Sequence, residues 1–141
     1  MKILLPVDGS ANSMRAIEHT LNIAKKHSEA KVTLLTVACM HVFRTYDYNL
    51  VNLENLHEKC ISSWRPVLEE AQKMFVDAGL QVESVIVNGD PADVISQYAE
   101  ENQMDRLIMG SRGLGGFKGL ILGSVAYKVL SKVNIPVTII K

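Results

Sequence analysis

The chain is poor in cysteine, balanced in charge and free of long apolar runs. Its two cysteines, Cys39 and Cys60, are too few for a disulfide scaffold, so we expect reduced thiols in a cytoplasmic protein. The 15 basic and 15 acidic residues cancel, so the chain lacks the basic excess of a general nucleic-acid binder or a polybasic membrane anchor. No run approaches the roughly 20 apolar residues of a transmembrane helix, and Asp8 ends the opening run too early for an export signal. We therefore predict that neither nucleic acid nor a membrane is a partner.

The histidines are also few, and their spacing matches no metal site. They are His19, His27, His41 and His57. What the chain does have is an ordinary globular composition, with 141 residues of which 48% are hydrophobic and 21% charged. No linker, internal repeat or low-complexity tract interrupts it, so we predict one domain over residues 1–141 and no metal ligands.

Apolar runs of strand length alternate along the chain with segments of helical period. The predicted strands cover residues 3–7, 31–38, 81–87, 106–109 and 137–140. Helical stripes fall between them, within residues 14–27, 53–78, 91–99 and 124–132. Strict alternation of this kind predicts an α/β fold, with one parallel sheet covered by helices on both faces.

Two stretches of the chain leave alternatives open. Residues 39–52 have no clear period, and their aromatic side chains either line a pocket or cover the sheet edge. Pro66 interrupts the long stripe, so that helix either kinks there or begins near Ser62 and Ser63. Cys60 falls on the apolar stripe, and we expect it in the core.

The most unusual segment is glycine-rich and runs from Gly110 to Gly123. Five of the nine glycines lie within positions 113–123, between a predicted strand and a predicted helix. Glycine is entropically costly to order and is typical of places where a backbone approaches a ligand closely. Free backbone amides and the positive end of the helix dipole would meet here, which predicts a phosphate site. The alternative is a flexible surface loop.

The two best-known phosphate motifs do not fit this segment. A Walker A loop needs Gly-Lys followed by Ser or Thr, whereas Lys118 is followed by Gly119. The dinucleotide fingerprint belongs after the first strand, where this chain has Asp8, Gly9 and Ser10.

The glycine spacing resembles that of nucleotide-binding universal stress proteins. Their motif is Gly, two residues, Gly, nine residues, Gly, and then Ser or Thr. Every spacing is met here, by Gly110, Gly113, Gly123 and Ser124. Similarity at residues 6–10, 89–91 and 136–140 extends the resemblance over the whole chain. It implies a Rossmann-like, doubly wound, five-stranded parallel sheet of order 3-2-1-4-5, with ATP, or AMP or ADP, bound where strands 1 and 4 diverge.

The resemblance also implies roles for individual residues. Asp8 and the backbone near Val37 would hold adenine or ribose, with Pro6 and Met109 packing nearby. Further residues would line the ribose and phosphate path, namely Gly110, Arg112 and Gly113. Others would offer backbone amides and a hydroxyl to the phosphates, namely Gly123, Ser124 and Val125.

One position departs from the pattern. Some members carry a hydroxyl residue where this chain has Ala126, and its loss removes one phosphate hydrogen bond, on the order of 1 kcal/mol. Mg²⁺ would be held by the phosphates instead of a protein cage, because it retains most of its waters.

Hydrolysis requires a positioned base, and Asp8 is the only carboxylate that we can place beside the loop. We therefore expect a nucleotide-binding regulatory protein of the stress response, with slow ATP turnover at most. The alternative is a dimeric interaction protein of the same fold that does not use nucleotide; the intact glycine motif favours the first. The resemblance further implies a homodimer through the C-terminal edge strand, Val137 to Ile140, whose open backbone groups would pair with a second copy.

Overall fold

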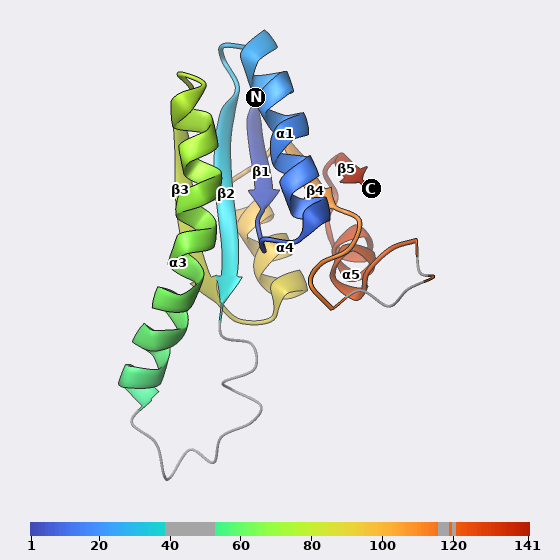
Figure 1. The fold of residues 1–141 in the computed structure, drawn as a ribbon. Coiled ribbons are helices and arrows are strands. Elements are labelled where there is room, and N and C mark those ends of the chain that lie inside the picture. The colour runs from blue at the N-terminus through green and yellow to red at the C-terminus, as the bar shows by residue number, and fades with distance from the viewer. Residues whose placement is uncertain (39–52, 116–118, 120) are drawn as a thin grey trace.

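The computed structural model describes residues 1–38, 53–115, 119 and 121–141. The expectations about residues 39–52 therefore lie outside the described residues. Strands and helices alternate along the chain (Figure 1). In order they are β1 (Lys2–Pro6), α1 (Ala11–Lys26), β2 (Lys31–Ala38), α3 (Leu53–Asp77), β3 (Val82–Asn88), α4 (Pro91–Glu101), β4 (Arg106–Gly110), α5 (Ser124–Lys132) and β5 (Val137–Ile140).

The strands form one parallel sheet of order β3-β2-β1-β4-β5. The predicted five-stranded α/β fold and its strand order are both confirmed. The chain builds outward from β1 to β3, and α4 then carries it back so that β4 pairs on the other side of β1. This reversal leaves the carboxyl ends of β1 and β4 as the place where the loops separate to opposite faces, which is where such sheets bind ligands.

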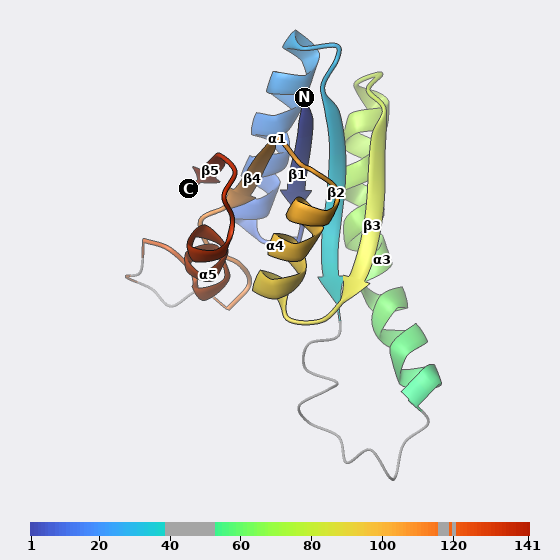
Figure 2. The same ribbon diagram turned by 180° about the vertical axis from the view of Figure 1, so that it is seen from behind.

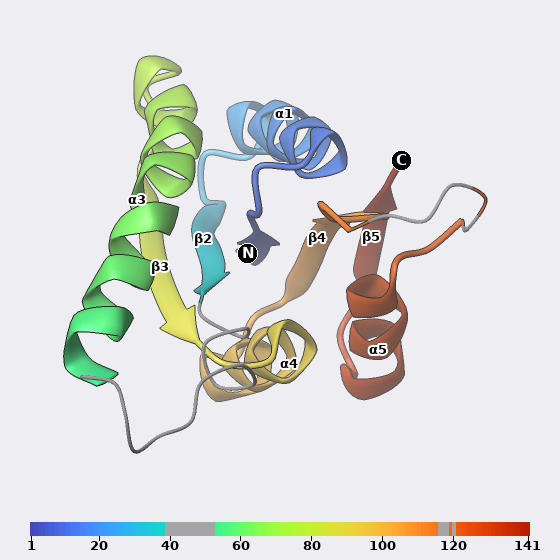
Figure 3. The ribbon, with the colours of Figure 1, turned by 60° about the horizontal axis from the view of Figure 1, so that its bottom comes forward.

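Helices cover both faces of the sheet. Figure 3 shows α1 and α3 on one side of the strands and α4 and α5 on the other, and Figure 2 shows the α4 and α5 side. Side chains of β1 alternate between these layers, with Ile3 and Leu5 packed toward α1 and α3 and Leu4 toward α4. The strand is almost wholly apolar because both of its faces are buried.

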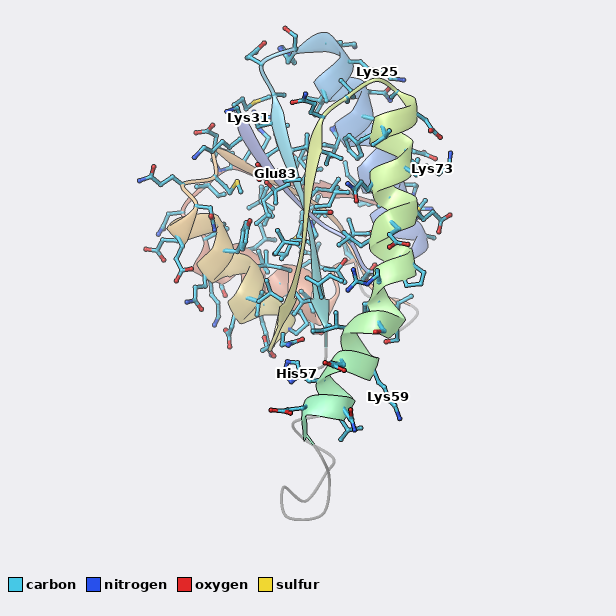
Figure 4. The ribbon with its side chains drawn as sticks, turned by 90° about the vertical axis from the view of Figure 1, so that its left-hand side faces the viewer. Lys25, Lys31, His57, Lys59, Lys73 and Glu83 are labelled. Carbon is cyan, nitrogen blue, oxygen red and sulfur yellow. The ribbon has the colours of Figure 1, made fainter. Side chains whose placement is uncertain are left out.

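Helix α3 differs from one of its predicted starts. It begins at Leu53 and contains Pro66, so a start near residues 62–63 is wrong. Its most buried side chains are Leu68, Ala71 and Phe75, all in the C-terminal half. The N-terminal turns of α3 extend past the end of the sheet, as Figures 1 and 4 show, and have less of the sheet to pack against.

Cys60 lies in the N-terminal half of α3, and two expectations about it are wrong. It is only half-buried, so it is not part of the core. It is also disulfide-bonded, so it is not a reduced thiol. Cys39 lies outside the described residues.

The N-terminal half of α3 makes a polar contact with the end of β3. His57, labelled in Figure 4 below the end of β3, contacts the side-chain amide of Asn88. Of the helices that the structure describes, none is both long and apolar enough to cross a bilayer.

Two helices begin at residues whose side chains cap them, and α5 does not. Ser10 caps α1 through its side chain, and Asp90 caps α4 with Pro91 at the first helical position. Helix α5 begins after Gly123, which has no side chain to cap it. The first-turn amides of α5 therefore lack the side-chain acceptor that the other two helices have.

Candidate functional site

The candidate site lies where β1 and β4 end, side by side. The end of β1 is anchored to β2, since the Val7 amide donates to Leu35 O at 2.9 Å. The buried Thr36 hydroxyl donates to Val7 O at 3.0 Å. These two bonds fix the backbone immediately before Asp8.

The Asp8 carboxylate is half-buried and accepts a hydrogen bond from the residue that caps α1. Its Oδ1 accepts from the Ser10 amide at 2.9 Å, and its backbone amide donates to Ser13 Oγ at 3.3 Å. Its other oxygen, Oδ2, faces Gly113: a Cβ placed on that glycine would lie 2.6 Å from Oδ2. The structure thus brings together Asp8 and the glycine loop, which are far apart in the sequence.

Gly110 is needed for packing between β4 and α1. A Cβ on this residue would lie 2.8 Å from the backbone carbon of Asn12 and 2.9 Å from the Ser13 nitrogen. Neither backbone atom can move without displacing the helix. The glycine therefore lets the first turn of α1 lie directly on the end of β4.

Ser111 ties the start of the glycine loop to three other elements. Its amide donates to Ile140 O at 2.7 Å, and its carbonyl accepts from the Gly123 amide at 2.7 Å. Its hydroxyl accepts from Asn12 Nδ2 at 3.1 Å. The residue is 1% exposed, so these bonds are shielded from water.

The beginning of α5 offers backbone amides. The Gly123 amide, expected to face a phosphate, is already bonded to Ser111 O, and the first helical bond runs from Tyr127 N to Gly123 O at 3.0 Å. The amides of Ser124 and Val125 come next and have no side-chain cap. With the helix dipole, these two amides favour an anion.

The remaining predicted residues lie around the ends of β1 and β4, but not all of their side chains face the site. Pro6 and Val37 are half-buried, whereas Arg112 and Ser124 are exposed. The side chains of Val37, Met109 and Val125 pack in the core beneath α4 and α5, together with Ala126. Met109 and Ala126 are buried, so their side chains are largely closed to a ligand.

Sequence reasoning missed the polar residues behind the loop. The Ser10 hydroxyl accepts from the Ser13 amide at 3.2 Å and also donates to Arg112 O at 3.4 Å. Asn12 and Ser111 gave no local signal, because their partnership spans 99 positions.

These groups suit binding of an ionic and polar molecule. Backbone amides and a helix N-terminus accommodate an anion, while Asp8 Oδ2 can accept hydrogen bonds from hydroxyl groups. Within the described ranges, no group of three or more His, Cys, Asp or Glu side chains is arranged to hold a metal ion.

Comparison with known proteins places this fold and loop in one family. Residues 1–141 match the universal stress protein family. The chain belongs to that family. It is 31% identical over 148 residues to the universal stress protein YxiE of Bacillus subtilis, covering 99% of this chain and 98% of the relative. The family resemblance drawn from the sequence is confirmed.

Solved structures of relatives share the architecture. The protein MJ0577, of Methanocaldococcus jannaschii, superposes with a TM-score of 0.85 at 31% identity, covering 99% of this chain and 94% of that one. A universal stress protein solved in complex with cAMP has a TM-score of 0.71 at 26% identity, covering 99% and 95%. A family member from Arabidopsis thaliana solved with AMP bound has a TM-score of 0.73 at 25% identity, covering 100% and 91%.

Proposed function

We propose that this universal stress protein binds an adenine nucleotide where β1 and β4 end, with phosphate at the α5 N-terminus and the nucleoside beside Asp8. The observation that carries the proposal is the uncapped start of α5, attached through Gly123 and Ser111 to a loop that packs on a carboxylate. The two ends of the site differ chemically. Amides favour phosphate, whereas Asp8 would repel it and suits the hydroxyls of ribose.

Two relatives support this assignment. One is solved with AMP and the other with cAMP, and these ligands share adenosine and one phosphate group. We propose ATP, AMP or ADP as the ligand of this chain, with Mg²⁺ held by the phosphates when it is present. Ala126 is 2% exposed and packs in the core. This position therefore offers the phosphates no side-chain group in place of the hydroxyl that some family members carry there.

The proposed role is regulatory. Phosphoryl transfer needs a group that orients the nucleophile as well as charge stabilisation. Besides the exposed Arg112, the side chains gathered at the described site are hydroxyls, an amide and one carboxylate, and that carboxylate is assigned to the nucleoside. We therefore propose ATP turnover that is slow at most.

Retention of ligand tests the proposal directly. Purified protein is heated and the released material is identified by mass analysis, and the stripped protein is titrated with AMP and Mg-ATP by calorimetry. An adenine nucleotide in the released material, or uptake of one in the titration, supports the proposal. Absence of both refutes it and leaves the nucleotide-independent interaction protein as the reading of this fold.

A matched pair of variants at Gly123 locates the phosphate. In Gly123→Asp, the new carboxylate would accept from the first-turn amides of α5 and occupy the proposed anion site. Gly123→Ala adds the same Cβ, 3.3 Å from Arg112 Cα, without the carboxylate. We expect the Asp variant to be the more thermally stable and yet the weaker nucleotide binder. Equal affinity of the two variants would place the phosphate elsewhere.

We also propose a homodimer through β5. This strand is at the sheet edge and pairs with β4 on one side. Pro136 O and Ile140 O accept from β4 and the residue after it, so alternation directs the backbone groups of Val137 and Ile139 outward. Antiparallel pairing of two such edges would satisfy these groups around a two-fold axis.

A further inference from the structure

We propose that Asn12 is a positioning residue, which acts through Ser111 to hold the α5 amides and the Asp8 side of the loop in binding geometry. The inference rests on the proposed nucleotide site and names a residue that regulates its geometry without touching the ligand. Its basis is a buried hydrogen-bonded pair joining the first turn of α1 to the start of the glycine loop.

Asn12 is an unusual choice for its position. It is the second residue of α1 and only 6% exposed, while the cap is supplied by Ser10. A buried amide is unfavourable unless its hydrogen bonds are made. Its Nδ2 donates to Ser111 Oγ at 3.1 Å, and its Oδ1 accepts from Arg15 Nη2. Both ends of the amide are therefore in use, which fixes its orientation.

The close approach that allows this bond is built into β4. Gly110 has no Cβ, and the backbone of Asn12 fills the place where one would lie. The side-chain amide of Asn12 is thereby brought onto Ser111, the next residue along the chain. Gly110, Asn12 and Ser111 form a single contact between α1 and the loop.

Ser111 connects the contact with α1 to the amides and the carboxylate of the proposed site. Its carbonyl accepts from the Gly123 amide, so the placement of Ser111 decides where the first turn of α5 begins. Arg112 follows, and its carbonyl accepts from Ser10 Oγ. Gly113 comes next and lies against Asp8 Oδ2. The positions of the amides and of the carboxylate in the proposed site thus both depend on the buried Asn12–Ser111 pair, which we call the anchor.

The effect of the Asn12–Ser111 pair on loop position can be separated from its effect on stability by removing the pair in two ways. In Asn12→Leu or Ser111→Ala one buried polar group loses its partner, which lowers both stability and nucleotide affinity. In the double variant neither polar group remains, so stability returns toward that of the parent. The loop has still lost its polar anchor, and we expect affinity for AMP to stay about tenfold weaker, the loss typical of removing a group that orients a ligand-binding residue.

The matched control is Thr20→Val on the same helix. Thr20 is 0% exposed, and its hydroxyl donates to Ala16 O at 2.8 Å, away from the loop. This variant is expected to lower the melting temperature without changing the AMP dissociation constant. Each variant is titrated with AMP by calorimetry at a temperature where circular dichroism shows that it is folded.

Weakened affinity in the double variant, with the control unchanged, supports the proposal. Parent-like affinity in Asn12→Leu or in the double variant overturns it, because the anchor is then not needed for binding. Should these variants fail to fold, Arg15→Ala takes their place, since Arg15 is exposed and orients the Asn12 amide. We expect a loss of about threefold from it, below that of the full anchor, and no loss overturns the proposal.

Failure of the proposed function gives a different result. If the parent protein binds no nucleotide, that function is refuted, and the positioning role is decided by NMR of the free protein. Loss of the anchor should then shift the amide resonances of Ser124 and Val125 in Asn12→Leu but not in Thr20→Val. Unshifted resonances in Asn12→Leu overturn the positioning role as well.

Discussion

Gly113 can be tested for the reason it is glycine. Its φ lies outside the left-handed region, so alanine is compatible with the backbone there. The obstacle is Asp8, whose Oδ2 would lie 2.6 Å from the new Cβ, well inside the 3.4 Å at which ordinary contacts begin. Gly113→Ala must therefore displace the Asp8 carboxylate or the loop.

The cost follows from what holds Asp8. Rotation of the carboxylate breaks its 2.9 Å bond from the Ser10 amide. A hydrogen bond to a charged group contributes about 1.5–3 kcal/mol, and partial exposure of Asp8 reduces this to roughly 1–2 kcal/mol. For a chain of this size the melting temperature should fall by about 3–8 °C. Nucleotide affinity should fall with it, because the carboxylate no longer faces the site.

A double-mutant cycle with Asp8→Ala isolates the clash. With the carboxylate gone, adding Gly113→Ala should cost less than about 0.5 kcal/mol, as for uncoupled positions. Gly115→Ala is the matched control for stability, since, among the described residues other than its chain neighbours, no atom lies within 4 Å of the added Cβ. Thermal and denaturant unfolding give the free energies. Equal costs of Gly113→Ala with and without Asp8 would refute this account of the glycine.

Three further outcomes are expected. Phe75→Ala, at a side chain with 0% exposure, should lower the free energy of unfolding by about 3–5 kcal/mol in denaturant titration, whereas a change under 1 kcal/mol would contradict its place in the core. The Lys132 ammonium lowers the pKa of Asp93, by hydrogen bonding first and then by charge, so any stability from this pair is present above the usual carboxyl pKa and is lost as pH falls through the lowered one. The melting temperatures of Asp93→Asn and the parent should therefore converge toward acidic pH, and a gap that widens there would contradict this. Ile139→Pro removes an outward backbone donor and should give monomers in sedimentation, whereas Ile139→Ala keeps that donor and the dimer; a dimer of the proline variant would exclude pairing through β5.

Much of the fold could be predicted because its signals are local. The apolar runs of β1 and β2 mark buried strands, and Asp90 with Pro91 marks the start of α4. The course of α3 through Pro66 was harder to predict. A proline costs one helical bond, and packing of the C-terminal half of that helix against the sheet offsets the loss.

The candidate site also has a part that the sequence predicts and a part that it does not. The spacing of Gly110, Gly113 and Gly123 identifies the loop and the family, and it predicts where a phosphate would bind. It does not say what each glycine contacts. Gly110 packs on the backbone of α1 and Gly113 lies against a carboxylate, and these reasons exist only once distant segments meet.

The sequence by itself determined the alternation of strands and helices, the helix caps and the glycine pattern, because each depends on residues within a few positions of one another. The tertiary structure alone decided that Asn12 reaches Ser111, that Asp8 faces Gly113, and that the amide of Gly123 is used within the loop. These contacts join residues about 100 positions apart or turn on the path of a loop. Close packing of whole helices and strands, and not the preference of any one residue, sets the distances between them.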